Sequence, residues 1–311
     1  MANPDLTALL SAFGRAWHAE NGPDPLFTDP CQRRLLTENE FRFMEQYLTI
    51  GAADAGTDLR GMMHGLILPP LLSRARLCED AFRAALRDGT EQFLLLASGL
   101  DTAALRWCRE TPCPVFEADR EAALRDKEAR LRRAGIPIPE DLHFVSGDVT
   151  SPDWAERLLR GGFRSGKKTF IAALGISFYL PPQKAADILA ALSALTKEGS
   201  SLLFDAGNEG FLRSEVPREA FLRGMAQAAG APMQCAFSRE TAEKALAAHG
   251  FTVENYFPPE AIQSRCFSSR RDGIAAFEHI HFFHARRSVP FHFMQYFVTS
   301  AFQSCKKMNI P

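Results

Sequence analysis

The stretch Gln92–Arg106, QFLLLASGLDTAALR, decides the fold class. It begins with an apolar run, FLLLA at 93–97, which is typical of a strand that is buried on both faces. A helical pattern occupies 101–110, and the small residues at 97–99, Ala-Ser-Gly, leave room for a tight turn between strand and helix. A strand, a tight turn and a helix make up the first half of a βαβ unit, so this stretch predicts an α/β protein with a parallel sheet.

The chain beyond this stretch repeats the alternation of strands and helices. Six further segments are interpreted as strands: 115–118, 143–146, 169–174, 201–205, 251–256 and 276–285. The last two are joined by a segment that contains prolines, so we expect them to pair antiparallel at one edge. The sequence therefore predicts a mostly parallel seven-stranded sheet with helices on both faces and an antiparallel edge strand.

The first ninety residues show helical periodicity and no convincing strand. Apolar residues recur at helical spacing over 5–20, 38–50 and 71–87. We expect three parts in the chain: an N-terminal helical lid or extension at 1–89, a ligand-binding domain at 90–289 with a helical insertion near 208–239, and a C-terminal tail at 290–311 that packs back on the domain.

Composition excludes several classes of partner. Lys and Arg total 36 against 37 Asp and Glu, and no segment concentrates positive charge, so no nucleic-acid partner is expected. The seven Cys form no CxxC pair, which favours reduced thiols. No signal-peptide pattern or bilayer-length apolar run is present, so we expect a cytoplasmic protein without a membrane partner. The sequence does not indicate an oligomeric state.

Polar and small residues follow the first three strands, where open parallel sheets bind ligands. After the 97–99 turn, Asp119 ends the second strand and suits the two ribose hydroxyls of a nucleoside, with Glu117 as second choice. Asp148 and Val149 follow the third strand and suit an adenine ring. For Asp119 the alternative is capping of the helix after it, which is compatible with ribose binding, and Asp148 is equally suited to capping the turn after it. Together these positions predict an adenosine-shaped cleft.

The sequence also gives information on three other features: a dinucleotide-binding motif, a metal site and a general base. Gly99 is the only glycine between 90 and 134, so the GxGxxG fingerprint of a nicotinamide oxidoreductase is missing. The pattern HIHFFH at 279–284 lacks acidic or Cys partners at ligand spacing, and we expect no metal. His64, His249 or a histidine of the final strand are candidate general bases, and the pattern identifies no catalytic residue.

Four segments resemble the leucine carboxyl methyltransferase family, which includes bacterial polyketide O-methyltransferase relatives. They are QFLLLASGLDTAALR, the block at 116–131, GISFYLP at 175–181 and DPLFTDP at 24–30, and the likeness spans roughly 6–286. The resemblance implies a class I methyltransferase with a Rossmann-like fold that uses S-adenosyl-L-methionine.

The resemblance also implies roles for individual residues. Arg74 would pair with the carboxylate of the cofactor, and a solvated helix arginine is the alternative for it. The turn of Ala97, Ser98 and Gly99 would approach the methionine part of the cofactor, Asp119 would hold the ribose, and Asp148 with Val149 would meet the adenine. Phe178 and Tyr179, together with Phe13 and Trp17 under the helical lid, are candidates for an acceptor pocket, with core packing as the alternative for each.

Two positions depart from the family pattern. Ala97 stands where the family has a glycine, and Leu174 stands where it has a glutamate that would contact the charged portion of the cofactor. If the turn requires a positive φ at 97, alanine costs about 1 kcal/mol relative to glycine.

We therefore expect an O-methyltransferase that acts on a carboxylate or hydroxyl oxygen of a small metabolite, such as a polyketide or an aromatic acid. Protein C-terminal carboxyl methylation is a narrower alternative. The two departures keep open a catalytically degenerate protein that acts as a cofactor-binding sensor or assembly partner.

Overall fold

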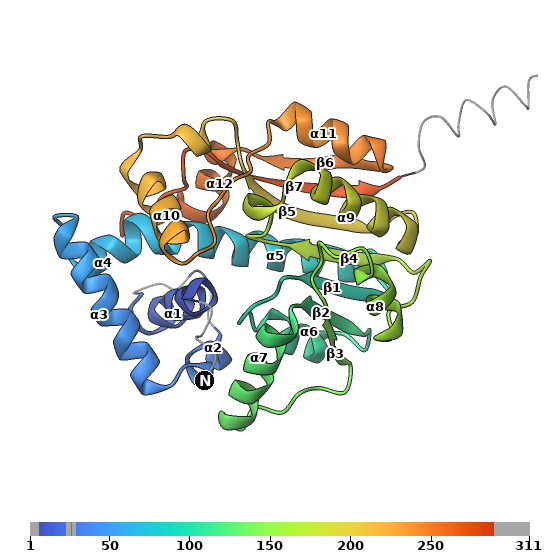
Figure 1. Ribbon diagram of the computed structural model, residues 1–311, viewed down its shortest axis with the longest axis horizontal. Helices are drawn as coiled ribbons and strands as arrows, with labels where there is room; N and C mark the ends of the chain where they lie inside the picture. Colours follow the sequence, from blue (N-terminus) through green and yellow to red (C-terminus); the bar gives the residue numbers. More distant parts are fainter. Residues whose placement is uncertain (1–5, 23–25, 27–28, 289–311) are drawn as a thin grey trace, which may run out of the picture.

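A seven-stranded sheet forms the centre of the computed structural model, which describes residues 6–22, 26 and 29–288 (Figure 1). The strands are β1 (Gln92–Leu96), β2 (Val115–Asp119), β3 (Leu142–Ser146), β4 (Thr169–Ala173), β5 (Ser201–Gly207), β6 (Phe251–Phe257) and β7 (Ile280–Arg287). Their order is β3-β2-β1-β4-β5-β7-β6, and β7 alone runs antiparallel to its neighbours. This confirms the predicted sheet and its antiparallel edge. The chain reverses its direction of winding between β1 and β4, where open α/β sheets bind ligands.

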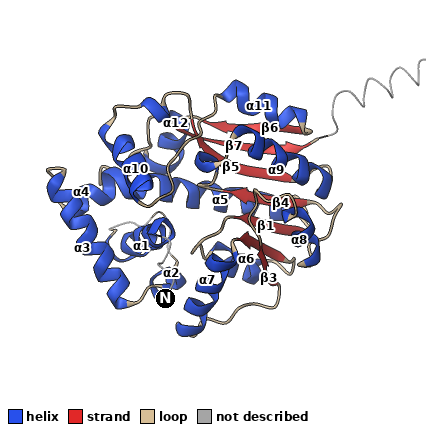
Figure 2. Cartoon of the chain, in the orientation of Figure 1, coloured by secondary structure: helices blue, strands red, loops and turns tan. Residues whose placement is uncertain are grey.

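Strand β1 is apolar throughout because helices cover both faces of the sheet (Figure 2). Phe93 and Leu95 pack into one core, and Leu94 and Leu96 into another, because successive side chains of a strand point to opposite faces. The first core is closed by α5 (Leu68–Arg87), α6 (Ala103–Glu110) and α7 (Glu121–Arg133), and the second by α8 (Trp154–Arg160), α9 (Pro182–Leu195) and α11 (Arg239–Ala248).

The region predicted to be an N-terminal helical lid is helical. It contains α1 (Leu6–Asn21), α2 (Pro30–Leu35), α3 (Glu38–Asp54), α4 (Leu59–Met62), a π-helical turn η1 (Met63–Ile67) and α5. Phe13 and Trp17 of α1 belong to a third core, which joins these helices to Phe178 and Phe282 of the sheet domain. Phe13 and Trp17 are thus core residues of the lid.

Two predicted elements begin at other residues in the structure. The long lid helix α5 begins at Leu68 rather than Leu71, because prolines are tolerated in a first turn, where no helical N–H bond is lost. The final strand begins at Ile280 rather than Ala276, because Ala276 and His279 donate their N–H groups to Gln263 and Glu219 side chains. The tail at 290–311 lies outside the described residues.

The predicted helix near 211–229 is divided. Phe211–Arg213 forms a 3-10 turn, η3, and α10 (Pro217–Ala228) begins at a proline, which suits the first position of a helix. The short elements η2 (Ser177–Tyr179), α12 (Pro259–Ile262) and the π-helical turn η4 (Gln263–Phe267) complete the described fold.

A partly buried carboxylate anchors the lid to the sheet domain. Glu40 completes the capping box of α3 with Thr37, and it also accepts two hydrogen bonds from Arg130 of α7, at 2.7 and 2.9 Å. Burial alone would raise the pKa of Glu40, but the bonds from Arg130 and Thr37 outweigh burial and lower the pKa to about 2.

The lowered pKa predicts an acid-labile contribution to stability. Glu40 stabilises the fold above its unfolded pKa, near 4.5, and this contribution is lost as the pH falls from about 4.5 towards 2. Glu40→Gln should therefore lower the free energy of unfolding at pH 7 and flatten its decline in acid, as measured by urea titration at several pH values. The exposed Glu240→Gln is the control, and identical acid profiles for Glu40→Gln and the wild type would contradict the prediction.

Candidate functional site

The turn after β1 adopts a left-handed conformation at two positions. Gly99 has φ +50°, and Ala97 has φ +52°, the one positive φ at a non-glycine residue of the described chain. The Ala97 N–H donates to the carbonyl of Ala118 at the end of β2, at 2.8 Å, which extends the β1–β2 pairing into the turn. Residue 97 thus has the positive φ that the sequence analysis considered. Alanine at this position therefore costs about 1 kcal/mol of conformational free energy relative to glycine.

Asp119 ties the end of β2 to this turn. The residue is 8% exposed, and its carboxylate accepts from Gly99 N–H at 2.8 Å and from Arg120 N–H at 2.7 Å. No side-chain cap begins α7, so the alternative of ordinary helix capping does not describe Asp119. The residue predicted to hold a ribose lies against the glycine predicted to approach the ligand.

Glu117, the second choice for the ribose, is turned inward. It is fully buried, forms an ion pair with the fully buried Lys127 of α7, and accepts a hydrogen bond from Ser98 Oγ at 2.8 Å. Burial raises the pKa of Glu117, and the Lys127 ammonium opposes that rise. Lys127 also donates to the carbonyl of Asp101, so this ion pair holds both ends of the turn.

Asp148 and Val149 follow β3 beside this site. The backbone N–H of Gly147 donates to the carbonyl of Asp119 at 2.9 Å, which places the ends of β2 and β3 together. Asp148 is exposed and accepts from the hydroxyl and N–H of Thr150, and these bonds lower its pKa. This is the turn-capping arrangement that the sequence left open. Val149 is buried in the core beneath.

Arg74 is an ordered residue of α5 and not a solvated helix arginine. Its Nε and one terminal nitrogen both lie 2.8 Å from Oδ2 of the fully buried Asp205 in β5. The Arg74 side chain is 19% exposed, and its guanidinium lies 5.8 Å from the centre of the Phe178 ring. Asp205 had no signal in the sequence beyond its place at a strand end.

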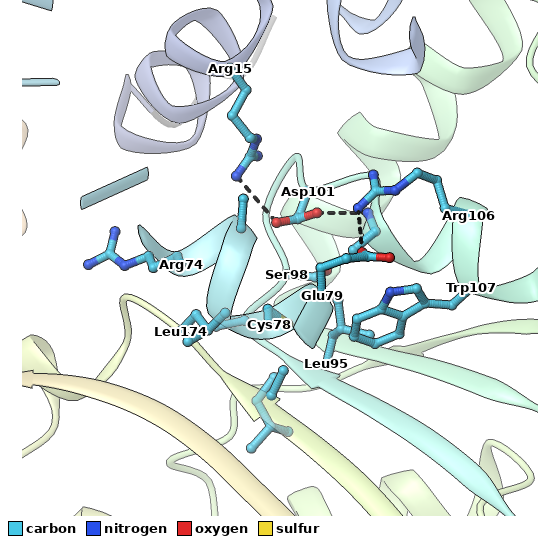
Figure 3. Close-up of a pocket in the computed structure, with 15 residues that line it drawn as sticks. Arg15, Arg74, Cys78, Glu79, Leu95, Ser98, Asp101, Arg106, Trp107 and Leu174 are labelled. Atoms are coloured by element: carbon cyan, nitrogen blue, oxygen red, sulfur yellow. Dashed lines mark hydrogen bonds and ion pairs between the residues drawn. The ribbon is translucent and has the colours of Figure 1, made fainter. Parts of the chain in front are cut away.

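A cavity beside the turn gathers several predicted residues (Figure 3). Arg74, Ala97, Ser98 and Leu174 line it, and Figure 3 shows Arg15 pointing to Asp101 while Arg74 extends away from both. We call it the turn cavity. The lining does not include Gly99, Asp119, Asp148 or Val149. It does include four charged residues that the sequence analysis did not predict: Arg15, Glu79, Asp101 and Arg106.

These missed residues connect the lid to the turn. Arg15 of α1 forms an ion pair with Asp101 at 3.2 Å, and Gln32 of α2 donates to the carbonyl of Leu100 at 3.1 Å. Asp29 caps α2 and binds both Arg106 and the Thr102 hydroxyl. The first aspartate of the DPLFTDP segment, at 24, lies outside the described residues, but its last aspartate, Asp29, holds the lid on the turn.

A second, mostly apolar cavity lies between the lid and α10, and we call it the lid cavity. Arg74, Gly175 and Tyr179 line it, together with Leu6, Thr7, Leu10, Ser11, Leu66, Ile67, Pro70, Leu71, Leu222, Met225, Ala226, Ala229 and Met233. Phe178 lies outside both linings, because it is fully buried against Phe211, with ring centres 5.2 Å apart. Arg74 is common to both cavities.

The histidines considered as general bases do not line either cavity. His279 binds Glu219 at 2.7 Å, and His281 binds the Tyr256 hydroxyl at 3.0 Å, with burial lowering the pKa of His281 to about 4. His64 binds the carbonyl of Asp272, and neither it nor His249 lines a cavity described above. Within 6–22, 26 and 29–288, no cluster of His, Cys, Asp and Glu has the makeup of a metal site, and no helix is long and apolar enough to cross a bilayer.

Comparisons with known proteins agree on one family. The model of the family described as leucine carboxyl methyltransferase matches residues 8–193. A Bacillus subtilis (strain 168) protein named "Putative S-adenosyl-L-methionine-dependent methyltransferase YktD" is 32% identical over 295 residues, which are 90% of this chain and 97% of that protein. A Mycobacterium tuberculosis (strain ATCC 25618 / H37Rv) protein, Rv3787c, whose name describes it in the same words, is 32% identical over 64% of this chain and 65% of its own length.

Solved structures share the fold at low identity. A DUF574 family protein of Streptomyces avermitilis MA-4680 superposes with a TM-score of 0.57 at 16% identity, covering 90% of this chain and 97% of its own. At that identity the likeness concerns the fold alone.

The strained turn generates a prediction about stability. Ala97→Gly should raise the free energy of unfolding by about 1 kcal/mol, because glycine adopts a positive φ without a steric penalty. Ala104→Gly in α6 is the matched control and should lower it by about 1 kcal/mol or more, because glycine is unfavourable inside a helix. Urea unfolding measures both, and a loss of stability in Ala97→Gly would show that the alanine is not strained.

Proposed function

The chain belongs to the leucine carboxyl methyltransferase family, and from this premise we propose that it transfers a methyl group to a carboxylate or hydroxyl oxygen of a small metabolite, polyketide-like or an aromatic acid. It is an S-adenosyl-L-methionine-dependent methyltransferase. The observation that supports the proposal is the position of Arg74, which borders both the turn cavity and the apolar lid cavity. A cofactor in the first and an acceptor in the second would meet at this residue.

The residues at the strand ends fit the cofactor. A nearly buried carboxylate, Asp119, lies beside a glycine turn and suits ribose hydroxyls. Arg74 lines a cavity of mixed charge and has donors beyond those that contact Asp205, and a guanidinium suits a carboxylate. In this proposal Ala97, Ser98 and Gly99 enclose the methionine part, and Asp148 with Val149 borders the adenine. Leu174 adds an apolar wall where the family has a carboxylate.

The contribution of the protein to the reaction is orientation. When bound, the cofactor supplies an activated methyl group that an acceptor oxygen displaces in line. Holding the reactants at near-attack distance supplies about 7 to 11 kcal/mol. Asp29 and Gln32 hold the N-terminal helices against the turn, and in this proposal that cover excludes water. A carboxylate acceptor needs no general base, which suits the lid cavity, whose only charged lining residue in the described chain is Arg74. Tyr179, in that lining, would contact the acceptor.

The cofactor site predicts selective binding. Asp119→Ala should raise the Kd for S-adenosylhomocysteine about 10- to 100-fold in calorimetry, because hydrogen bonds to a charged group contribute about 1.5–3 kcal/mol. Asp187→Ala, an exposed carboxylate on α9, is the control, and NAD should not compete. An unchanged Kd in Asp119→Ala would remove Asp119 from the site.

The nature of the acceptor is tested by the product. With tritiated S-adenosylmethionine and a panel of aromatic acids, phenols and C-terminal peptides, we expect transfer to a small acid or phenol. Alkali releases volatile methanol from a methyl ester and leaves a methyl ether intact, so it distinguishes carboxylate from hydroxyl acceptors. Transfer to peptides alone would favour protein carboxyl methylation. Tight cofactor binding with no transfer to any acceptor would favour the catalytically degenerate alternative.

A further inference from the structure

Asp205 is a fully buried carboxylate to which the proposed function gives no role. It lies in β5, two residues before the end of the strand, and its contacts reach α5 and the segment 175–177 that follows β4. Oδ2 accepts a hydrogen bond from Nε of Arg74 in α5 and forms an ion pair with Nη2 of the same residue, both at 2.8 Å. Oδ1 accepts from the N–H of Gly175 after β4 at 2.6 Å, and the backbone carbonyl of Asp205 accepts from the Ser177 hydroxyl of η2. These segments form the boundary between the two cavities, since Arg74 lines both and Gly175 lines the lid cavity.

The contacts with Asp205 leave Arg74 only part of its donor set. A guanidinium has five N–H donors in a fixed plane. The hydrogen bond from Nε and the ion-pair contact of Nη2 turn that edge of the plane towards Asp205. No hydrogen bond joins the other terminal nitrogen, Nη1, to another of the residues that the structure describes, so Nη1 can donate to a ligand. Because the guanidinium is planar, fixing one edge also fixes the direction of the donors on the other.

The main chain beside Arg74 shows how tightly the guanidinium is placed. Gly175 has φ +74°, and a Cβ at this residue would lie 3.2 Å from both Cζ and Nη1 of Arg74. The ring of Phe178 lies on the guanidinium at 5.8 Å. Asp205 holds Gly175 through its N–H as well, so one carboxylate sets both the arginine and the backbone against which it packs.

We propose that Asp205 is the positioning residue that directs the free edge of Arg74 at the carboxylate of the amino-acid part of the cofactor. This inference rests on the proposed function. It predicts that Asp205 contributes to recognition of the amino-acid part of the cofactor and not to recognition of the nucleoside. A residue needed only for folding would affect both parts equally.

The test compares two ligands that differ in that part. S-adenosylhomocysteine carries the amino-acid carboxylate, and 5′-methylthioadenosine lacks the amino-acid group altogether. Asp205→Asn retains an oxygen that accepts from Gly175 N–H but presents no carboxylate to Arg74. By calorimetry we expect the Kd for S-adenosylhomocysteine to rise about tenfold and the Kd for methylthioadenosine to stay within about twofold.

A second variant reaches the same arginine without altering Asp205. Gly175→Ala should displace the guanidinium, because the added Cβ would press on it, and should produce the same selective loss. Arg74→Ala should lose affinity for S-adenosylhomocysteine, and the double variant with Asp205→Asn should lose no more than Arg74→Ala alone, since the two residues act together. Asp187→Asn on the exposed face of α9 is the matched control and should change neither Kd.

The outcomes separate this inference from the function on which it rests. If the wild-type protein binds neither ligand, the proposed function fails. If the wild type binds both, but Asp205→Asn and Gly175→Ala weaken both equally or leave S-adenosylhomocysteine unaffected, the positioning role of Asp205 is overturned. A selective loss in either folded variant, with the double variant equal to Arg74→Ala, supports it.

Discussion

The hydrogen bond from Gly99 N–H to the Asp119 carboxylate is the interaction on which the site depends. It joins the turn after β1 to the end of β2, and it sets the main-chain path that Ala97 must follow. A hydrogen bond to a charged group contributes about 1.5–3 kcal/mol, whereas a positive φ at alanine costs about 1 kcal/mol. The bond therefore outweighs the strain, which explains how the turn keeps its form without the family glycine at 97.

The buried pair of Glu117 and Lys127 supports the same turn from below. Glu117 holds Ser98, and Lys127 holds the carbonyl of Asp101, so both flanks of Gly99 are fixed by one ion pair. Removing one partner of a buried pair leaves an uncompensated charge, at a cost of about 3–5 kcal/mol. On the outer side, Arg15, Gln32 and Asp29 attach the lid to the same turn. The contacts of the N-terminal helices and the shape of the turn are thus coupled.

The sequence predicted the features that depend on local pattern. Apolar runs and turn residues predicted all seven strands, because a buried strand must be apolar and a strand-to-helix turn must be small. The cluster of Asp119 and the 97–99 turn followed from the rule that parallel strands end at one edge. The inward direction of Glu117 was not predictable, since it depends on the partner Lys127, ten residues away on a helix.

Other features depended on contacts between distant segments. The Arg74–Asp205 pair joins residues 131 positions apart, and Asp29–Arg106 joins residues 77 apart, so no local pattern signals either. Phe178 and Tyr179 are neighbours of similar character, yet one is core and the other lines a cavity. Their difference follows from the 3-10 turn η2, which points adjacent side chains in different directions.

The central claim is that the turn, Asp119 and Arg74 form one cofactor site, and a crystal structure of the protein with S-adenosylhomocysteine tests it most directly. The account predicts the ribose hydroxyls on the Asp119 carboxylate, the amino-acid carboxylate on the free edge of Arg74, and the adenine beside Asp148 and Val149. A ligand bound elsewhere, or one whose carboxylate lies away from Arg74, would contradict the account.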